Sequence, residues 1–214
     1  MTGPKPGQSG VSIERVSQVL LRSDPGRVAF DLGGVLLDGG VMSASDEDAA
    51  FHLLEHSYGV PFDLGRATWV EMLDPSERGL VSEAEVFGAL ASLSDGASVD
   101  EIRTAIVGMV YPVDPAVELL TKLHERGWVT SLATNHMVEW VDLWRSRFPW
   151  FSELDNVVCS AAVGHRKPSR EFFRVLSDTV DGPGAWFVDD RAANVRAAAR
   201  AGFQAVLLRL GPTW

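Results

Sequence analysis

The sequence predicts an α/β fold, in which a parallel sheet lies between two layers of helices and an all-helical segment follows the first strand. Three observations lead to this prediction. Short, continuous apolar runs such as 28–30 and 185–188 end abruptly at acidic residues, as fully buried strands do. These runs alternate with helical patterns of about ten residues, which indicates parallel strands joined by helices. From about 45 to 110, helical periodicity continues without any buried strand.

The chain is expected to begin with a flexible tail, because its first ten residues contain two prolines and three glycines. A helix is predicted over 13–20, where apolar residues recur at helical spacing. The turn signal Asp24-Pro25-Gly26 then precedes the first strand, at 28–30.

The inserted segment contains four predicted helices. Their apolar residues repeat at helical spacing over 49–58, 64–73, 83–93 and 99–110. The run Ser82-Glu83-Ala84-Glu85 predicts a capping box before the third of these helices, because the Ser and Glu side chains can each satisfy a free backbone amide. The insert is therefore expected to be an all-helical unit of its own.

After the insert, helices and strands alternate to the end of the chain. Asp114 is expected to cap a helix that has Pro115 at its first position. The predicted elements are helices at 116–126, 137–148, 169–177 and 192–201 and strands at 128–133, 156–159, 185–188 and 205–208. The predicted organisation is a tail and helix over 1–26, a Rossmann-like three-layer α/β core formed by 27–40 and 111–214, and a helical domain over 41–110.

Length and composition exclude several classes of protein. The chain has 214 residues, 46% hydrophobic and 22% charged, as in a folded globular protein. Its formal charge of -10 argues against nucleic acid or an anionic membrane surface as a partner. We expect neither a membrane span nor a secretory signal, because no apolar run is long enough. A single cysteine, Cys159, fits a cytoplasmic protein, and the oligomeric state stays open.

Residues suited to metal and phosphate chemistry stand at the predicted strand ends and in one polar loop. Ligands of parallel sheets bind outside the carboxyl ends of the strands, so we expect these residues to converge at one edge. Crowded carboxylates repel one another, and an all-oxygen ligand set suits Mg²⁺ together with a substrate phosphate. In chain order the residues are Asp31, Thr134, Asn135, Lys167, Asp189 and Asp190.

Four short motifs follow one another at these positions. They are Phe30-Asp31-Leu32-Gly33-Gly34-Val35-Leu36, Leu132-Ala133-Thr134-Asn135, Arg166-Lys167-Pro168, and Phe187-Val188-Asp189-Asp190 followed by Asn194. In this order, with a helical insert after the first, they resemble the haloacid dehalogenase-like superfamily, in the branch with a helical cap. The resemblance extends over nearly all of 28–208 and implies that 41–110 is the cap.

The resemblance implies a Mg²⁺-dependent phosphohydrolase of a small phosphorylated metabolite, such as a sugar phosphate. Asp31 would attack phosphorus and carry an aspartyl-phosphate intermediate. Lys167 and the Thr134 hydroxyl would bind the phosphoryl oxygens, and Asn135 would support them.

The same resemblance implies a metal site. The Asp31 carboxylate, the backbone carbonyl of Gly33 and the Asp189-Asp190 pair would hold Mg²⁺, which shields the nucleophile from the incoming phosphate. Asp190 is the expected direct ligand, whereas Asp189 is either a ligand or a residue behind one. Because three acids occupy the site, phosphate binding is expected to depend steeply on the metal.

One departure from the family pattern concerns the proton. Most phosphatases of this superfamily carry a second Asp two residues after the nucleophile, as general acid and then base, and this chain has Gly33 there. General acid–base catalysis contributes roughly 10²- to 10⁴-fold. Three consequences stay open: another residue from the cap or a loop moves the proton, the substrate has a good leaving group, or turnover is weak.

Two alternative functions stay open. A 2-haloacid dehalogenase also uses an Asp nucleophile and lacks the second Asp, but it needs no metal, so the Asp189-Asp190 pair argues against it. A catalytically weak relative that binds a phosphorylated ligand or a protein partner is the other, because Gly33 replaces the acid. A phosphomutase is disfavoured, since its chemistry depends on that acid.

The remaining candidate residues concern specificity and structure. Cap residues that could select the substrate are Arg66, Trp69, Glu71 and Arg78, in no order, and Gly39 and Gly40 are expected to form a hinge. His165 is the histidine best placed to donate a proton, although a structural role is favoured for it, and His52 and His56 are expected at the surface. Packing roles are expected for Trp140, Trp144, Trp150 and Cys159.

Overall fold

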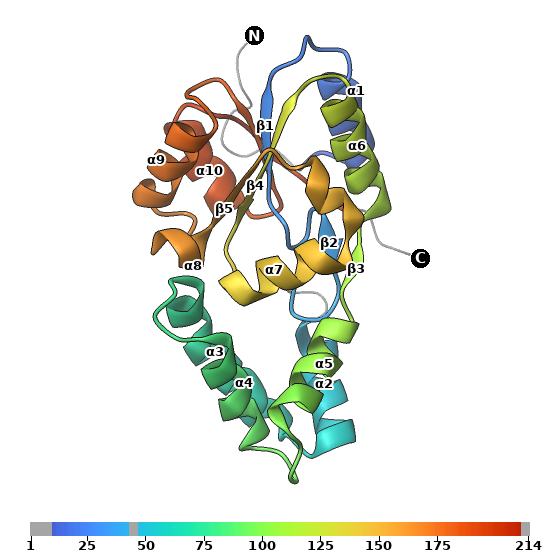
Figure 1. The fold of residues 1–214 in the computed structure, drawn as a ribbon, viewed down its shortest axis with the longest axis vertical. Helices are drawn as coiled ribbons and strands as arrows, with labels where there is room; N and C mark the ends of the chain where they lie inside the picture. Colours follow the sequence, from blue (N-terminus) through green and yellow to red (C-terminus); the bar gives the residue numbers. More distant parts are fainter. Residues whose placement is uncertain (1–9, 43–46, 211–214) are drawn as a thin grey trace.

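The computed structural model describes residues 10–42 and 47–210. The flexible tail expected over the first ten residues therefore falls almost wholly outside the described part. Residues 43–46 of the cap expected over 41–110 also lie outside it. An α/β core forms one end of the elongated molecule in Figure 1, and a group of helices forms the other. No helix among the described residues is long and apolar enough to cross a membrane.

A five-stranded sheet forms the centre of the core, with the strand order β5-β4-β1-β6-β7. All of its strand pairs are parallel. The strands are β1 (Arg27–Phe30), β4 (Val129–Thr134), β5 (Asn156–Cys159), β6 (Trp186–Asp189) and β7 (Gln204–Leu207). The predicted α/β fold with a parallel sheet is confirmed.

Helices cover both faces of the sheet (Figure 1). Side chains of successive strand residues point to opposite faces, so β1 sends Ala29 to one hydrophobic core and Val28 and Phe30 to the other. The core around Ala29 is completed by α9 (Arg170–Thr179) and α10 (Ala192–Arg200). The larger core includes α1 (Ile13–Leu20), α6 (Asp114–Glu125), α7 (Val138–Arg147) and the short helix η1 (Pro149–Glu153).

Four helices between β2 and β3 make up the other end of the molecule, and we call residues 47–108 the helical insert. They are α2 (Glu47–Tyr58), α3 (Phe62–Glu77), α4 (Glu83–Ala91) and α5 (Val99–Gly108). The antiparallel strands β2 (Leu37–Asp38) and β3 (Tyr111–Pro112) connect the insert to the core. No strand lies within the described insert, as the sequence predicts.

The larger core continues from the α/β core into the helical insert. Trp140 of α7 stacks on Phe87 of α4 at a centroid distance of 5.8 Å and lies 6.1 Å from the ring of Trp69 of α3. Trp140 and Trp144 are fully buried, which confirms the expected packing role. The insert is thus held against the core by aromatic packing.

Several details differ from the sequence predictions. The predicted capping box at Ser82 is present, and a second one at Ser98 was not predicted. The helix expected to be capped by Asp114 instead begins at that residue, with Val113 as its cap. Helix α3 was expected to end near 73, but it runs through Pro75 to its end at Glu77. The short elements β2, β3, η1 and α8 (Ser160–Val163) were not predicted, because so few residues show no periodicity.

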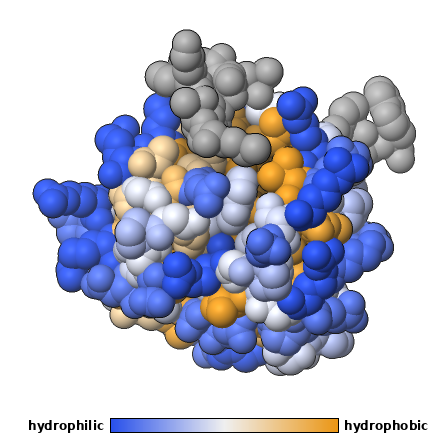
Figure 2. All heavy atoms as spheres, turned by 90° about the horizontal axis from the view of Figure 1, so that it is seen from above, coloured by the Kyte–Doolittle hydropathy of each residue, from blue (hydrophilic) through white to orange (hydrophobic). Residues whose placement is uncertain are grey.

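The surface of the core end is largely polar. Figure 2 views this end from above and shows hydrophilic side chains around the rim, with apolar residues visible between them. Scattered apolar surface of this kind is normal for a folded protein.

Candidate active site

The candidate nucleophile Asp31 follows directly after β1, at the carboxyl edge of the sheet. Its backbone N–H donates to the Val188 carbonyl of β6, so the neighbouring strand fixes its position. The Leu32 N–H, at 2.6 Å, and Lys167 Nζ, at 2.8 Å, both contact its Oδ1. Because both donors contact Oδ1, Oδ2 is the oxygen that neither of them engages. Burial raises the pKa of Asp31 well above its usual value, and Lys167 acts against this shift.

Lys167 lies between two carboxylates in the interior. Its Nζ is 2.8 Å from Asp31 Oδ1 and 2.8 Å from Asp189 Oδ2, and only 1% of its side chain is exposed. Although burial acts to lower it, the two carboxylates hold the pKa of Lys167 above its usual value. A fully buried ammonium group is tolerated here because it has two charged partners.

Asp189 is fully buried and has a donor on each side of its carboxylate. Its Oδ1 accepts from the Arg191 N–H at 2.8 Å and from Asn194 Nδ2 at 3.1 Å. Its Oδ2 accepts from Lys167 at 2.8 Å and from the same Asn194 amide at 3.0 Å. Both oxygens are therefore occupied by the protein itself. Burial acts to raise the pKa of Asp189, but Lys167 outweighs it and holds the pKa below its usual value.

Asp190, unlike Asp189, has a carboxylate oxygen that no donor in the described part of the chain satisfies. Its Oδ1 is buried and has no hydrogen-bond partner among the described residues. The backbone of Gly34, at a φ of 71°, passes so close that a Cβ there would lie 2.7 Å from Asp190 Oδ2, so glycine is required at this position. Burial raises the pKa of Asp190, and the neighbouring Asp189 adds to the shift.

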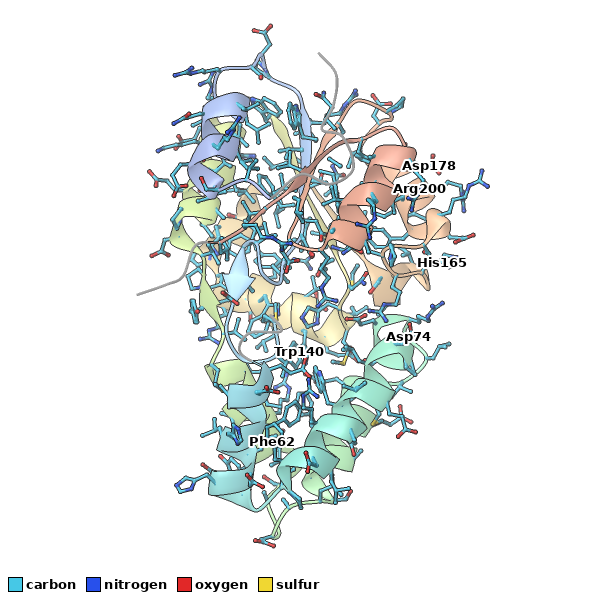
Figure 3. The ribbon with its side chains drawn as sticks, turned by 180° about the vertical axis from the view of Figure 1, so that it is seen from behind. Phe62, Asp74, Trp140, His165, Asp178 and Arg200 are labelled. Carbon is cyan, nitrogen blue, oxygen red and sulfur yellow. The ribbon has the colours of Figure 1, made fainter. Side chains whose placement is uncertain are left out.

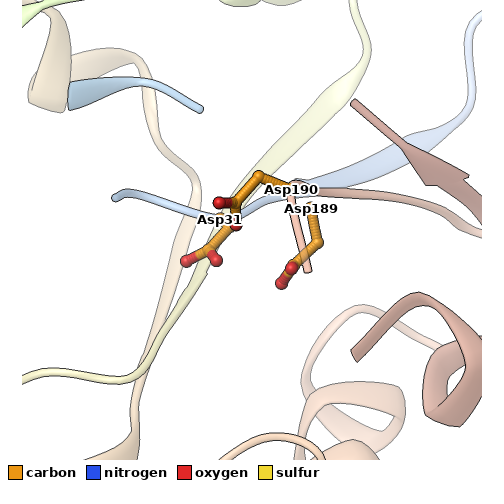
Figure 4. Close-up of side chains that lie close together, drawn as sticks. All are labelled: Asp31, Asp189 and Asp190. Carbon is orange, nitrogen blue, oxygen red and sulfur yellow. The ribbon is translucent and has the colours of Figure 1, made fainter. Parts of the chain in front are cut away.

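The three aspartates form a group that fits a metal ion. One carboxylate oxygen of each of Asp31, Asp189 and Asp190 lies within 4.8 Å of the others, and Figure 4 shows the three side chains gathered at the strand ends. The unpartnered Asp190 Oδ1 is a carboxylate oxygen without a donor, which is what an oxygen-preferring cation such as Mg²⁺ would satisfy. The residues present therefore fit the expected cation.

Thr134 and Asn135 reach the same edge from the end of β4. Thr134 is buried and lines the cavity described below. Asn135 is held to the neighbouring loop, since its Oδ1 accepts from the Lys167 N–H at 2.7 Å and its Nδ2 donates to the Lys167 carbonyl at 2.9 Å. Through these two bonds, Asn135 fixes the backbone that carries Lys167.

A small cavity lies at this edge, between the core and the helical insert. Its volume is about 60 Å³, which leaves room for only a few water-sized groups. Asp31 and Lys167 line it from the core, and Trp69, Leu73 and Glu77 line it from α3. The nucleophile candidate and the end of α3 thus share one cavity.

His136 contributes an uncharged part of the cavity wall. Its Nε2 lies 3.3 Å from Met42 Sδ, and its ring is 4.8 Å from that of Trp140. The Met137 N–H donates to its Nδ1 at 3.3 Å. Burial lowers the pKa of His136 to about 4, so the imidazole is neutral at physiological pH.

The end of α3 carries a carboxylate that the sequence did not single out. Glu77 is 7% exposed and lies 2.6 Å, through Oε2, from Nη2 of Arg166. The other arm of Arg166, Nη1, is 2.8 Å from Asp74 Oδ1, and Figure 3 shows Asp74 at the end of the insert helix nearest the core, close to the loop of His165. Burial raises the pKa of Glu77 to about 7, even though Arg166 opposes the shift. Asp74 has a lowered pKa, because Arg166 and Arg78 both donate to it.

Of the four insert residues proposed for specificity, only Trp69 lines the cavity. Arg66 is 3.0 Å from Asp48 within the insert, Arg78 pairs with an acid of its own helix, and Glu71 is exposed. Glu77 was missed because the predicted helix stopped at 73, before Asp74-Pro75. The glycine two residues beyond Glu77 is the signal of a helix end that could have corrected this prediction.

The three highlighted histidines lie away from the cavity lining. His52 and His56 are exposed on α2, as expected, and His52 stacks on Phe62 at 4.4 Å. His165 is partly buried and does not line the cavity. The expected burial of Cys159 is confirmed.

Comparison with known proteins places the chain in a family. The model of the haloacid dehalogenase-like hydrolase family matches residues 27–202. The match includes all the predicted motif residues. No curated protein matches the sequence.

Solved structures of low sequence identity share the fold. A haloacid dehalogenase-family enzyme of Bacteroides thetaiotaomicron, crystallised with magnesium and inorganic phosphate, has 20% identity and a TM-score of 0.69, with 89% of this chain and 97% of that chain covered. A predicted hydrolase of the same family from Porphyromonas gingivalis has 22% identity and a TM-score of 0.62, with 85% and 89% covered. L-2-haloacid dehalogenase from Xanthobacter autotrophicus, with chloropropionic acid covalently bound, has 16% identity and a TM-score of 0.58, with 83% and 74% covered.

Proposed function

Because this chain belongs to the haloacid dehalogenase-like hydrolases, we propose that it is a Mg²⁺-dependent phosphohydrolase of a small phosphorylated metabolite, acting through an aspartyl-phosphate at Asp31. The observation that carries the proposal is the buried, unpartnered Oδ1 of Asp190 beside Asp31 and Asp189. A buried carboxylate oxygen without a donor is costly unless a cation satisfies it. The neighbour from B. thetaiotaomicron, crystallised with magnesium and phosphate, agrees with a cation at such a site.

The described contacts support a different proposed role for Asp189 than for Asp31 and Asp190. Asp31 and Asp190 would hold the metal together with the Gly33 carbonyl, whereas Asp189, with both oxygens already engaged, would position Lys167. When bound, Mg²⁺ would shield the carboxylates from the phosphate and polarise the phosphoryl group. The metal and Lys167 together would supply the positive charge that offsets the three carboxylates when a phosphate binds.

The proposed reaction begins with attack on phosphorus by Asp31 Oδ2, the oxygen that neither Leu32 nor Lys167 engages. Lys167 and the Thr134 hydroxyl would bind the phosphoryl oxygens, and Asn135 would keep the Lys167 backbone in place. Hydrolysis of the aspartyl-phosphate would then release phosphate and restore the carboxylate.

The size of the cavity bears on the substrate. About 60 Å³ suffices for a phosphoryl group and little more, and α3 forms the opposite wall. We therefore assign phosphate binding to the core, and selection of the remaining substrate to the helical insert.

A phosphatase panel with and without Mg²⁺ tests this function. The wild type is expected to release phosphate from at least one small substrate only with the metal, and Asp31→Asn is expected to lose this activity by about 10³-fold or more, since it removes the nucleophile. Asp178→Asn makes the same chemical change on the exposed face of α9 and is the matched control (Figure 3).

The alternatives predict different results. Metal-independent release of chloride from 2-chloropropionate would identify a dehalogenase and overturn the proposal. Tight, Mg²⁺-dependent binding of a phosphorylated ligand without any turnover would identify a binding protein. Activity retained by Asp31→Asn would remove Asp31 as the nucleophile.

A further inference from the structure

The structure shows why no acid stands two residues after Asp31. A Cβ placed on Gly33 would lie 2.6 Å from the backbone carbonyl oxygen of Met42, a separation that real side chains essentially never adopt. An aspartate therefore does not fit at this position without a shift of the chain around Met42. If the reaction uses a protein acid, a different element has to supply it.

Two of the other titratable side chains that line the cavity are poorly suited to this task. His136 is neutral, and its Nδ1 already accepts from the backbone while its Nε2 faces the Met42 sulfur. Glu47 lies at the first turn of α2 and pairs with Arg66 inside the insert, at 3.5 Å. The contacts of both side chains thus tie them to the backbone, to Met42 or to the insert rather than leaving them directed at a substrate.

Glu77 differs from His136 and Glu47 in its position, at the end of α3 where that helix lines the cavity. In-line displacement places the leaving oxygen on the side of phosphorus opposite Asp31, and that side of the cavity is formed by α3. Glu77 ends α3 and lines the same cavity of about 60 Å³ as Asp31. Glu77 is thus a carboxylate of the insert that shares this small cavity with the nucleophile, on the side from which a leaving group would depart.

The docking of α3 holds Glu77 there. Gly79, at a φ of 71°, lies so close to α8 that a Cβ would be 2.6 Å from the Ala161 carbonyl, so only glycine permits this approach. Arg166, in the loop that carries Lys167, then contacts Glu77 at 2.6 Å. The carboxylate is thus anchored from the core although it belongs to the insert.

The surrounding charges suit a group that exchanges a proton. The charged groups that act on Glu77 are Arg166, Arg191 and Lys167 from the core and Asp74 from its own helix, and α8 carries none. Arg166 divides one positive charge between Asp74, which stays ionised, and Glu77. Because burial raises the pKa of Glu77 to about 7, both of its protonation states are populated near neutral pH, as general acid–base catalysis requires.

We propose that Glu77 is the general acid and then the general base of the phosphohydrolase reaction, on which this inference rests, in place of the carboxylate absent at Gly33. As Asp31 forms its bond to phosphorus, the bond from phosphorus to the leaving oxygen breaks and its electron pair stays on that oxygen, which takes the proton of Glu77. In the second step, water gives a proton to the Glu77 carboxylate and attacks phosphorus. The Asp31–phosphorus bond breaks, and phosphate leaves.

Glu77→Gln tests the proposal in pre-steady-state kinetics. With p-nitrophenyl phosphate, whose leaving group needs little protonation, this variant is expected to release close to one equivalent of p-nitrophenol in a burst, because the intermediate forms but is hydrolysed slowly. With an alkyl phosphate found active in the panel, no burst is expected, and kcat should fall roughly 10²- to 10⁴-fold. The change in kcat near pH 7 that titration of Glu77 causes in the pH profile of the wild type should also be absent from the variant.

Glu118→Gln is the matched control, since it makes the same chemical change at an exposed glutamate of α6 that does not line the cavity. It is expected to keep kcat within a few-fold of the wild type. Mg²⁺-dependent binding of trifluoroberyllate should be the same in both variants and the wild type, which verifies that the Asp31 site is folded.

Three results overturn the inference while the proposed function stands. They are an unchanged kcat in Glu77→Gln, an equal loss in Glu118→Gln, and a loss in Glu77→Gln that is the same for both substrates and without a burst. A wild type that releases no phosphate from any substrate instead refutes the proposed function.

Discussion

Two networks meet at the cavity, and each consists of two carboxylates and one cation. The two cations are neighbouring residues of one loop. Lys167 points into the core and joins Asp31 to Asp189, whereas Arg166 points to the helical insert and joins Glu77 to Asp74. The core network is almost completely buried. In the insert network, exposure of the side chains increases from 9% for Glu77 to 21% for Arg166 and 50% for Asp74.

The difference lies in how the networks are held. Strand ends and the amide of Asn194 fix the core network, so its charges are paired whatever the insert does. The insert network spans two parts of the molecule and exists only while α3 is docked. A group whose charge costs free energy on burial, such as Glu77, is therefore coupled to docking, because docking of α3 favours its protonated form.

The largest expected effect belongs to the core network. Lys167→Met leaves two buried carboxylates without their cation, and breaking such a pair costs about 3–5 kcal/mol. Denaturant unfolding in EDTA should show this loss of stability. Arg166→Met is the matched variant, and it should cost less, because Asp74 is half exposed and Glu77 can take up a proton.

Equal losses in the two variants would contradict the distinction between the networks. A larger loss in Arg166→Met would show that docking of the insert, rather than the core network, limits the stability of the whole chain.

The second prediction concerns pH and the insert network. Above pH 4.5 the unfolded chain ionises Glu77, whereas the folded chain keeps it protonated up to about pH 7, so its contribution to stability is complete below pH 4.5 and is lost as the pH rises to about 7. The stability of the wild type relative to Glu77→Gln should therefore fall by roughly 3 kcal/mol over this window. Denaturant unfolding of both proteins at several pH values measures the difference. A difference that stays constant with pH would place Glu77 in a solvated environment.

Most of the fold could be predicted from the sequence because its core strands are short apolar runs with abrupt ends. The predicted strand at 156–159 is the observed β5, and the acidic residues after the runs at 28–30 and 185–188 lie at the sheet edge. The β2–β3 ribbon was not predictable, since two-residue strands have no periodicity and are defined only by their pairing. The end of α3 was placed too early because Pro75 suggests a break, whereas the helix continues for two residues beyond this proline.

The candidate site also has one part that the sequence predicts and one part that it does not. Asp31 and Asp189 could be predicted to converge because both stand at the carboxyl ends of parallel strands, and Lys167 was expected beside them from the polar loop that carries it. The bonds that occupy both oxygens of Asp189 could not, since they depend on the rotamer of Asn194. Gly79 could have placed Glu77 at the end of its helix, but its position at the cavity could not be predicted, because it depends on how the helical insert docks on the core.

The smallest expected effect tests the position where the core loop meets the start of the insert. Gly33→Ala brings a Cβ to within 2.6 Å of the Met42 carbonyl, and relief of this contact by a backbone shift should cost about 1–3 kcal/mol in denaturant unfolding. Gly33→Asp carries the same strain together with the carboxylate that other phosphatases have there. If Glu77 moves the proton, Gly33→Asp should be no more active than Gly33→Ala on an alkyl phosphate, whereas a gain of tenfold or more would show that the site lacks an acid. Combining Gly33→Asp with Glu77→Gln sharpens the test, since recovery of activity in that double variant would mean that a proton donor at either place serves the same leaving oxygen.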